Sequence, residues 1–256
     1  MKSEVFERLY AQKLVAEPGC WKTCNGGFCC SNNHPDFDFD FITTQGTDIV
    51  YLPREYQWAN ERLATFENTD GRYPSVLELD LGEFSIGIVY SKCQLLGACE
   101  GVIDKPLLCR LYPFLPVYRY SGEFERTIPS STFDVTFDAI GQSSPCTVLN
   151  QKNYDVEFGS GSFYRSLDTY VLFYLRCASH LAVAMTVAIK DNAKLMSLSG
   201  KQFWKRWELL HLGGRFLADD LLTEKILGEY RSAQSSDPEF SLAEEKALLK
   251  SIREAN

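Results

Sequence analysis

The 256-residue sequence lacks an excess of basic residues. Its 26 Lys and Arg are outnumbered by 34 Asp and Glu, which gives a formal net charge of −8. A surface that binds nucleic acid or anionic lipid needs clustered basic side chains to neutralise phosphate groups. We therefore expect no nucleic-acid partner and no membrane partner.

Signals for export or membrane insertion are also missing. The first fourteen residues mix acidic and basic side chains and contain no apolar stretch typical of a secretory signal. The longest apolar run, residues 170–189, has Arg176 and His180 near its middle. Because a charged side chain at the centre of a bilayer costs roughly 3 kcal/mol, this run predicts a buried helix. We expect a cytoplasmic protein.

Several familiar catalytic motifs are absent as well. There are three His residues and no convincing Ser/His/Asp set, and residues 159–162, GSGS, lack the Lys of a phosphate-binding loop. A thioredoxin-like redox site needs a C-x2-C pair, which the sequence does not contain. Radical enzymes that cleave S-adenosylmethionine use C-x3-C-x2-C, whereas the second gap here is four residues.

What the sequence has instead is clustered cysteine. Of nine cysteines, four lie within eleven residues of the segment PGCWKTCNGGFCC (residues 18–30), and three more lie in residues 93–109. In a reducing cytoplasm, clustered thiols hold metal more often than they form disulfides. We therefore predict one metal-binding unit that the fold brings together. The predicted ligands are Cys20, Cys24, Cys29, Cys30, Cys93, Cys99, Cys109 and Cys146.

The residue types restrict the metal to two choices. Thiolates bind zinc, or iron in an iron–sulfur cluster, and four of them complete one zinc site or one [4Fe–4S] cluster. The surplus of thiols slightly favours iron–sulfur, while one site, two sites and non-ligand cysteines all stay open. Cys177 stands alone in the apolar run and predicts core packing. His34 is a further candidate ligand, whereas His180 and His211 lie in predicted helices, where we expect a satisfied core or surface role.

The segments around these cysteines resemble the YkgJ-type cysteine-cluster proteins, a family described as zinc- or iron-chelating and named for a CxxCxxCC motif. The matching segments are PGCWKTCNGGFCC, CQLLGAC (residues 93–99) and KPLLCRLYPF (residues 105–114). The resemblance covers residues 18–150, and Cys146 is similar to a further cysteine of longer members. The first two gaps are three and four residues here, where the family name implies two and two. The resemblance implies metal chelation without a defined reaction.

Hydrophobic periodicity predicts an α+β fold, with a small antiparallel sheet that carries the cysteine metal site and a helical C-terminal part. We expect a metal-binding domain over residues 1–160 and a helical region over residues 161–256, with packing of both as one domain as the alternative. Strands are predicted at residues 36–41, 48–52, 75–81, 84–90, 114–120, 124–128 and 133–137. Helices are predicted at residues 4–16, 53–66, 166–190, 201–212 and 218–230, followed by a polar linker over residues 232–238 and a helix from residue 241.

Three functions remain open from the sequence. The leading hypothesis is a metal-binding protein with an iron–sulfur cluster or zinc. The second is an enzyme that uses the cluster, either a redox enzyme or, by analogy with the similar cluster of flagellin lysine-N-methylases, a protein lysine methylase; it predicts a pocket with acids such as Asp36, Asp38 and Asp40. The third is a zinc-stabilised scaffold whose C-terminal helices bind a protein partner through an exposed apolar patch.

Arg110 either stabilises the thiolates or is an ordinary surface residue.

Overall fold

The computed structural model describes residues 4–11, 48–62, 74–82, 84–92, 106–144, 146, 149, 163–212, 214–215 and 220–255. Within these ranges the chain forms nine α-helices, one short 3-10 helix and two small antiparallel sheets. This confirms the expected mixture of helices and small antiparallel sheets. The strand predicted at residues 36–41 lies outside the described ranges.

The strands follow the alternating patterns of the sequence. The first sheet has the order β1-β3-β2 and the second pairs β4 with β5, all antiparallel. Gly82, with a φ of 87°, lies between β2 and β3. The strand bounds are Asp48–Tyr51 (β1), Ser75–Asp80 (β2), Ser85–Lys92 (β3), Phe114–Tyr118 (β4) and Phe124–Pro129 (β5).

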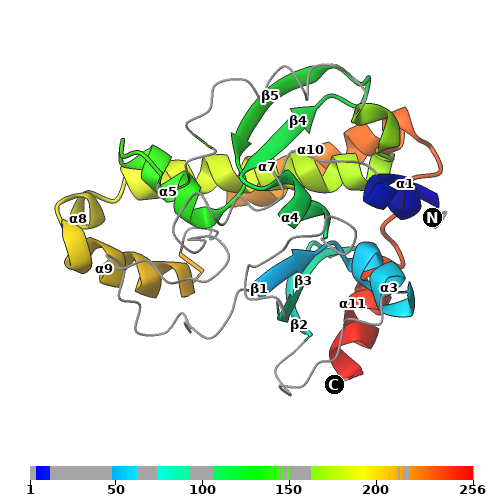
Figure 1. Ribbon diagram of the computed structural model, residues 1–256, viewed down its shortest axis with the longest axis horizontal. Coiled ribbons are helices and arrows are strands. Elements are labelled where there is room, and N and C mark those ends of the chain that lie inside the picture. The colour runs from blue at the N-terminus through cyan, green and yellow to red at the C-terminus, as the bar shows by residue number, and fades with distance from the viewer. Residues whose placement is uncertain are drawn as a thin grey trace.

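The longest helix, α7 (Thr169–Lys190), runs through the middle of the molecule between the β4–β5 pair and the three-stranded sheet (Figure 1). It packs against α10 (Asp220–Ser236), α5 (Thr132–Ala139) and β4. Among the described residues it is the one helix that is long and apolar enough, by length and composition, to cross a membrane. The apolar side chains of its first half, from Tyr170 to Leu175 together with Cys177, are buried, whereas Val183 and Val187 in its second half are exposed.

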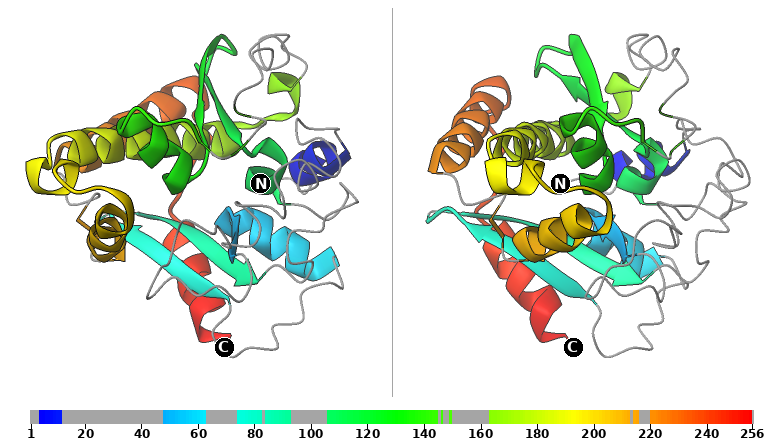
Figure 2. Two further views of the ribbon diagram at one scale, coloured as in Figure 1. Left: turned by 60° about the vertical axis from the view of Figure 1, so that its left-hand side comes forward. Right: turned by 90° about the vertical axis from the view of Figure 1, so that its left-hand side faces the viewer.

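Two hydrophobic clusters make up the core. The larger one contains side chains of the first sheet and of N-terminal and C-terminal helices, so residues from either side of residue 160 share one core. Figure 2 shows the C-terminal helix (red) running across the first sheet. Its helices include α1 (Glu4–Ala11), α3 (Pro53–Arg62), α4 (Leu107–Leu111), α7, α10 and α11 (Glu245–Glu254). The smaller cluster lies between α5, the end of α7, α8 (Ala193–Met196) and α9 (Gly200–Leu212).

The strand predicted at residues 133–137 is wrong, because this segment is the helix α5. Ser131 caps the helix: its Oγ accepts a hydrogen bond from the backbone N of Asp134 at 3.0 Å. Phe133 and Phe137, four residues apart, reach two Trp rings of α9, at centroid distances of 5.1 and 5.2 Å. The apolar residues of this segment fit a period of two as well as a helical spacing, and these distant aromatic partners favour the helix.

Several helix ends also differ from the predicted ones. Helix α10 continues to Ser236, so most of the polar linker predicted over residues 232–238 is helical. Helix α11 begins at Glu245, because the Oγ of Ser241 accepts from the backbone N of Ala243 and forms a turn before the helix. Helix α7 begins at Thr169, where Asp168 caps it through the backbone N of Val171 at 2.9 Å.

A buried carboxylate fixes α11 to the rest of the fold. Glu245 accepts hydrogen bonds from the hydroxyls of Tyr170 (2.7 Å) and Tyr174 (3.0 Å) on α7, and from Nε of Arg54 on α3 (3.0 Å). One turn further along α11, Leu249 lies against Gly87 of the central strand β3. Helix α11 therefore covers the sheet at a point where a side chain on β3 would not fit.

This close approach makes Gly87→Ala destabilising. An added Cβ would lie 2.8 Å from the carbonyl oxygen of Leu77 and 2.9 Å from a methyl group of Leu249, so strand and helix would have to separate. We expect the free energy of unfolding in urea to fall by about 1–3 kcal/mol. The matched control is Gly228→Ala inside α10, where nothing lies within 4 Å; it should raise the same quantity by about 0.5–1 kcal/mol. Equal stability of Gly87→Ala and wild type would contradict the packing.

Candidate metal centre

Two of the eight predicted ligands lie in the described part of the chain: Cys109 on α4, and Cys146 in the loop after α5. Among the described residues, no group of three or more His, Cys, Asp or Glu is arranged to hold a metal ion. The other predicted ligands and candidate acids lie outside the described residues, and these are Cys20, Cys24, Cys29, Cys30, His34, Asp36, Asp38, Asp40, Cys93 and Cys99.

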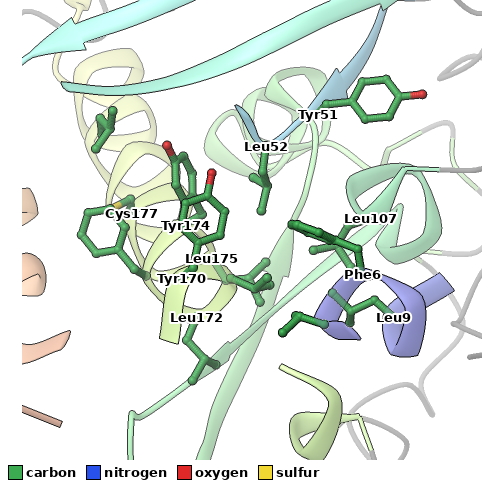
Figure 3. Packing of buried hydrophobic residues seen from close by; sticks show 14 of the residues in the cluster. Phe6, Leu9, Tyr51, Leu52, Leu107, Tyr170, Leu172, Tyr174, Leu175 and Cys177 are labelled. Atoms are coloured by element: carbon green, nitrogen blue, oxygen red, sulfur yellow. The ribbon is translucent and has the colours of Figure 1, made fainter. Parts of the chain in front are cut away.

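Helix α4 presents Cys109 on the side opposite its hydrophobic anchors. Leu107 and Leu111, four residues apart, are fully buried, and Figure 3 shows Leu107 lying against Phe6 and Leu9 of α1. Cys109 is two residues from each anchor, which places it on the other side of the helix. Its side chain is half-buried. The short sequence PLLCRL thus places one thiol at the edge of the core.

Glu55 of α3 anchors the start of α4. Its Oε1 accepts hydrogen bonds from the backbone N of Leu107 (2.6 Å) and from the hydroxyl of Tyr10 on α1 (2.9 Å), and its Oε2 accepts one from the backbone N of Leu52 (3.2 Å). The carboxyl is completely buried. Burial raises the pKa of Glu55 to about 7, and the three hydrogen bonds and nearby Arg110 offset part of the rise. One carboxyl group therefore connects α1, α3 and α4.

Arg110, which follows Cys109, is only 1% exposed, so the interpretation as an ordinary surface residue is wrong. Its Nη1 donates hydrogen bonds to the carbonyl oxygens of Leu9 (3.3 Å) and Tyr10 (3.0 Å), near the end of α1, where carbonyl groups lack partners within the helix. The guanidinium also lies over the Tyr10 ring, 4.4 Å from its centroid. Arg110 thus fixes α4 to α1 and buries a positive charge between these two helices.

The described residues that border the two cysteine-bearing segments belong to one packed unit. The first segment follows α1 and leads into β1 at Asp48, and the second follows β3 at Lys92 and leads into α4. Asp48 pairs with Lys92 in the sheet. Helix α4 is held to α1 by Arg110 and to α3 by Glu55. Both segments therefore start and end on elements that contact one another.

The loop of Cys146 is held by a second buried carboxylate, Asp134. The backbone N of Cys146 donates to the Oγ of Ser144 (3.0 Å), and this Oγ donates to Oδ1 of Asp134 (2.5 Å). Oδ2 of Asp134 accepts from the hydroxyls of Tyr112 (3.0 Å) and Ser131 (2.5 Å). Burial raises the pKa of Asp134, and these hydroxyl hydrogen bonds oppose the rise.

The remaining cysteine and two histidines have packing roles, as expected. Cys177 is a free thiol buried in α7, and burial raises its pKa, so it stays neutral and unreactive. Nε2 of His180 lies 2.8 Å from Glu229, which also pairs with Arg176. Burial alone would raise the pKa of Glu229, but hydrogen bonds from His180 and Arg176 lower it to about 2. His211 stacks on a Trp ring of α9.

The sequence interpretation did not single out the two carboxylates that hold α4 and the Cys146 loop. Local signals for both were present. Glu55 is the third residue of α3 and reaches back to the backbone N of Leu52, as the acid of a capping box does. Ser131-x-x-Asp134 also has the spacing of a helix start. Neither pattern reveals the hydrogen bonds to residues far along the chain.

The raised pKa of Glu55 makes stability depend on pH. Between the ordinary pKa of 4.5 and about 7, the folded protein retains a proton that the unfolded chain has lost, so stability falls as the pH rises through this window. Glu55→Gln cannot ionise and should not show this fall. From about pH 5 to about pH 8, the difference in free energy of unfolding should shift by about 2 kcal/mol in favour of the variant. Urea titrations at several pH values measure it, and parallel pH profiles would contradict the burial of an ionisable carboxyl group.

Neither a family model nor a curated protein or solved structure matches this chain. The resemblance of its cysteine segments to the YkgJ-type proteins therefore stays a prediction that depends on the motifs alone. The function has to be argued from the residues of the chain itself.

Proposed function

We propose that this chain is a cytoplasmic metal-binding protein whose clustered cysteines chelate an iron–sulfur cluster or zinc. The candidate ligands are the eight cysteines of the two clustered groups and the loop after α5. The observation that carries the proposal is the convergence of the described elements that border both cysteine-bearing segments. The sequence supplies the thiols, and the packed unit of α1, α3, α4, β1 and β3 supplies a common base for them.

This convergence lowers the cost of assembling a metal site. Bringing ligands from separate segments to one ion costs conformational entropy, and the cost is smaller when the ends of each segment are already close. The ladder pair Asp48–Lys92 holds one end of each segment. Glu55 and Arg110 hold the other ends, through Leu107 and Tyr10.

The described residues around Cys109 suit a metal centre that is held by thiolates. Cys109 is half-buried on the side of α4 that its apolar anchors leave open, and Arg110, the next residue in the chain, buries a cation between α4 and α1. A metal held by four thiolates carries net negative charge, which nearby cations and hydrogen-bond donors offset. When bound, zinc would supply a closed structural centre, and an iron–sulfur cluster would supply electron transfer or, at an open iron, substrate activation.

A second candidate function is the zinc-stabilised scaffold with a protein partner. It expects exposed apolar side chains on the C-terminal helices, and the described part of these helices carries several. They are Val183 and Val187 on α7, Met196 on α8 and Leu209 on α9. The enzyme hypothesis, a methylase-like or redox enzyme, depends on acids outside the described residues, so no described contact favours it.

The proposal is tested by metal content after anaerobic purification. Iron, zinc and acid-labile sulfide are measured per chain for wild type, Cys24→Ala and Cys109→Ala. Both variants should lose metal, with affinity lowered by more than about tenfold, because each removes a ligand. The matched control is Cys177→Ala, which removes a buried thiol from α7 and should cost about 1 kcal/mol of stability while leaving the metal content unchanged.

The outcomes separate the alternatives. Brown protein with iron and sulfide supports a cluster, and colourless protein with stoichiometric zinc supports the scaffold. Wild-type protein without metal, or unchanged metal in both ligand variants, would rule out the joint site.

A further inference from the structure

We propose that Asp134 is a positioning residue of this metal centre, which holds α4 and the Cys146 loop together so that Cys109 and Cys146 serve the same centre. The inference rests on the proposed function and deepens it. It names Asp134 as the buried group that sets the positions of these two cysteines relative to each other.

Asp134 accepts several hydrogen bonds, and these bonds fix the orientation of the groups that donate them. It is almost completely buried at the start of α5 and receives hydrogen bonds from three hydroxyl groups, those of Tyr112, Ser131 and Ser144. A hydroxyl has one proton to donate, so each of the three commits its proton to the carboxylate. Their orientations are thereby set.

Tyr112 links Asp134 to the helix that carries Cys109. It follows Cys109 by three residues at the end of α4, so the two side chains leave the helix on roughly the same side. The hydroxyl of Tyr112 reaches Oδ2 of Asp134 at 3.0 Å. The rotation of α4 about its axis, and with it the direction of Cys109, is therefore fixed relative to α5.

Ser144 links Asp134 to the backbone of Cys146. Because the proton of Ser144 is committed to Asp134, its lone pairs are available to accept from the backbone N of Cys146, and they do so at 3.0 Å. The chain returns to Asp134 through Gly141, whose φ of 68° reverses its direction after α5. Hydrogen bonds from Gly141 to Asp138 (3.1 Å) and from Gln142 to Phe137 (2.9 Å) complete a Schellman motif.

The placement of these hydrogen bonds favours a positioning role over a purely structural one. A buried ionic group is by itself weak evidence for a stabilising role, because a buried charged pair can often be replaced as a whole by apolar side chains of similar volume without loss of stability. Apart from its own helix cap at Ser131, Asp134 accepts hydrogen bonds from Tyr112 and Ser144, which lie on the two pieces of chain that carry Cys109 and Cys146. Loss of a group that orients a metal ligand weakens metal binding about 10–100-fold, and Asp134 would act one step further out, through these two residues.

The test uses full-length protein, loaded with Co²⁺ alone as the probe after removal of its own metal. Two variants are compared with wild type: Asp134→Asn, which keeps the shape of the side chain, and Ser144→Ala, which removes one bridge at a half-buried position. The first readout is the rate of Co²⁺ transfer to a chromophoric chelator, which should rise about tenfold. The second is alkylation of Cys146 by peptide mass spectrometry. In wild type, metal removal should raise this alkylation, and in both variants the difference between metal-bound and metal-free protein should shrink.

The matched control is Thr136→Val on the same helix. The Oγ1 of Thr136 accepts from Nε1 of Trp207 at 2.9 Å and faces the smaller hydrophobic cluster. This variant also loses a buried hydrogen bond, so it should lose comparable stability, yet it should transfer Co²⁺ at the wild-type rate. Faster transfer from the control as well would show that general destabilisation explains the effect and would overturn the inference.

The failure of the inference and the failure of the proposed function can be told apart. If wild type binds metal while Asp134→Asn and Ser144→Ala transfer it at the wild-type rate, Asp134 does not position the ligands and the proposed function still stands. If wild type binds no metal, both fall.

Discussion

A carboxylate that leaves water must receive hydrogen bonds from the protein, because an unpaired buried charge is strongly destabilising. This constraint organises the described part of the fold. Three buried carboxylates each receive donors from more than one part of the chain, and many of these donors are Tyr hydroxyls. The hydrophobic clusters bring the elements together, and the carboxylates fix their positions relative to one another. The three residues are Glu55, Asp134 and Glu245, whereas the side chain of Glu229 receives its donors from α7 alone.

Elements that depend on local pattern were predicted well. The alternation of β2 and β3 and the apolar run of α7 match the structure to within a few residues. The error at α5 had a different origin, since its apolar residues satisfy both periods. The cap at Ser131 and the Trp rings of α9, some seventy residues later, favour the helix. A sequence interpretation that gave the Ser131-x-x-Asp134 spacing more weight would have found this helix.

The candidate site could be predicted only in part. Cysteine clustering made Cys109 a candidate ligand, which stays a prediction, and the burial of its neighbour Arg110 was not foreseen. The reason is distance along the chain. Glu55 lies 45 residues from Tyr10 and 52 from Leu107, and Arg110 lies 100 from Tyr10. No local spacing encodes such pairs, because they exist only once the sheet and α3 have packed.

The hydrogen-bonded ion pair between Arg54 and Glu245 joins residues that are 191 positions apart in the sequence. Ribosomes make the chain from its N-terminus, so the first sheet and α3 exist long before α11. Until α11 has been made, Leu249 does not cover β3 at Gly87, and Arg54 lacks the Glu245 carboxylate with which it pairs. All eight predicted ligands precede α11 in the chain. The growing polypeptide therefore contains all the predicted ligand cysteines before α11 can cover the sheet, and closure of the core follows the synthesis of the last predicted ligand.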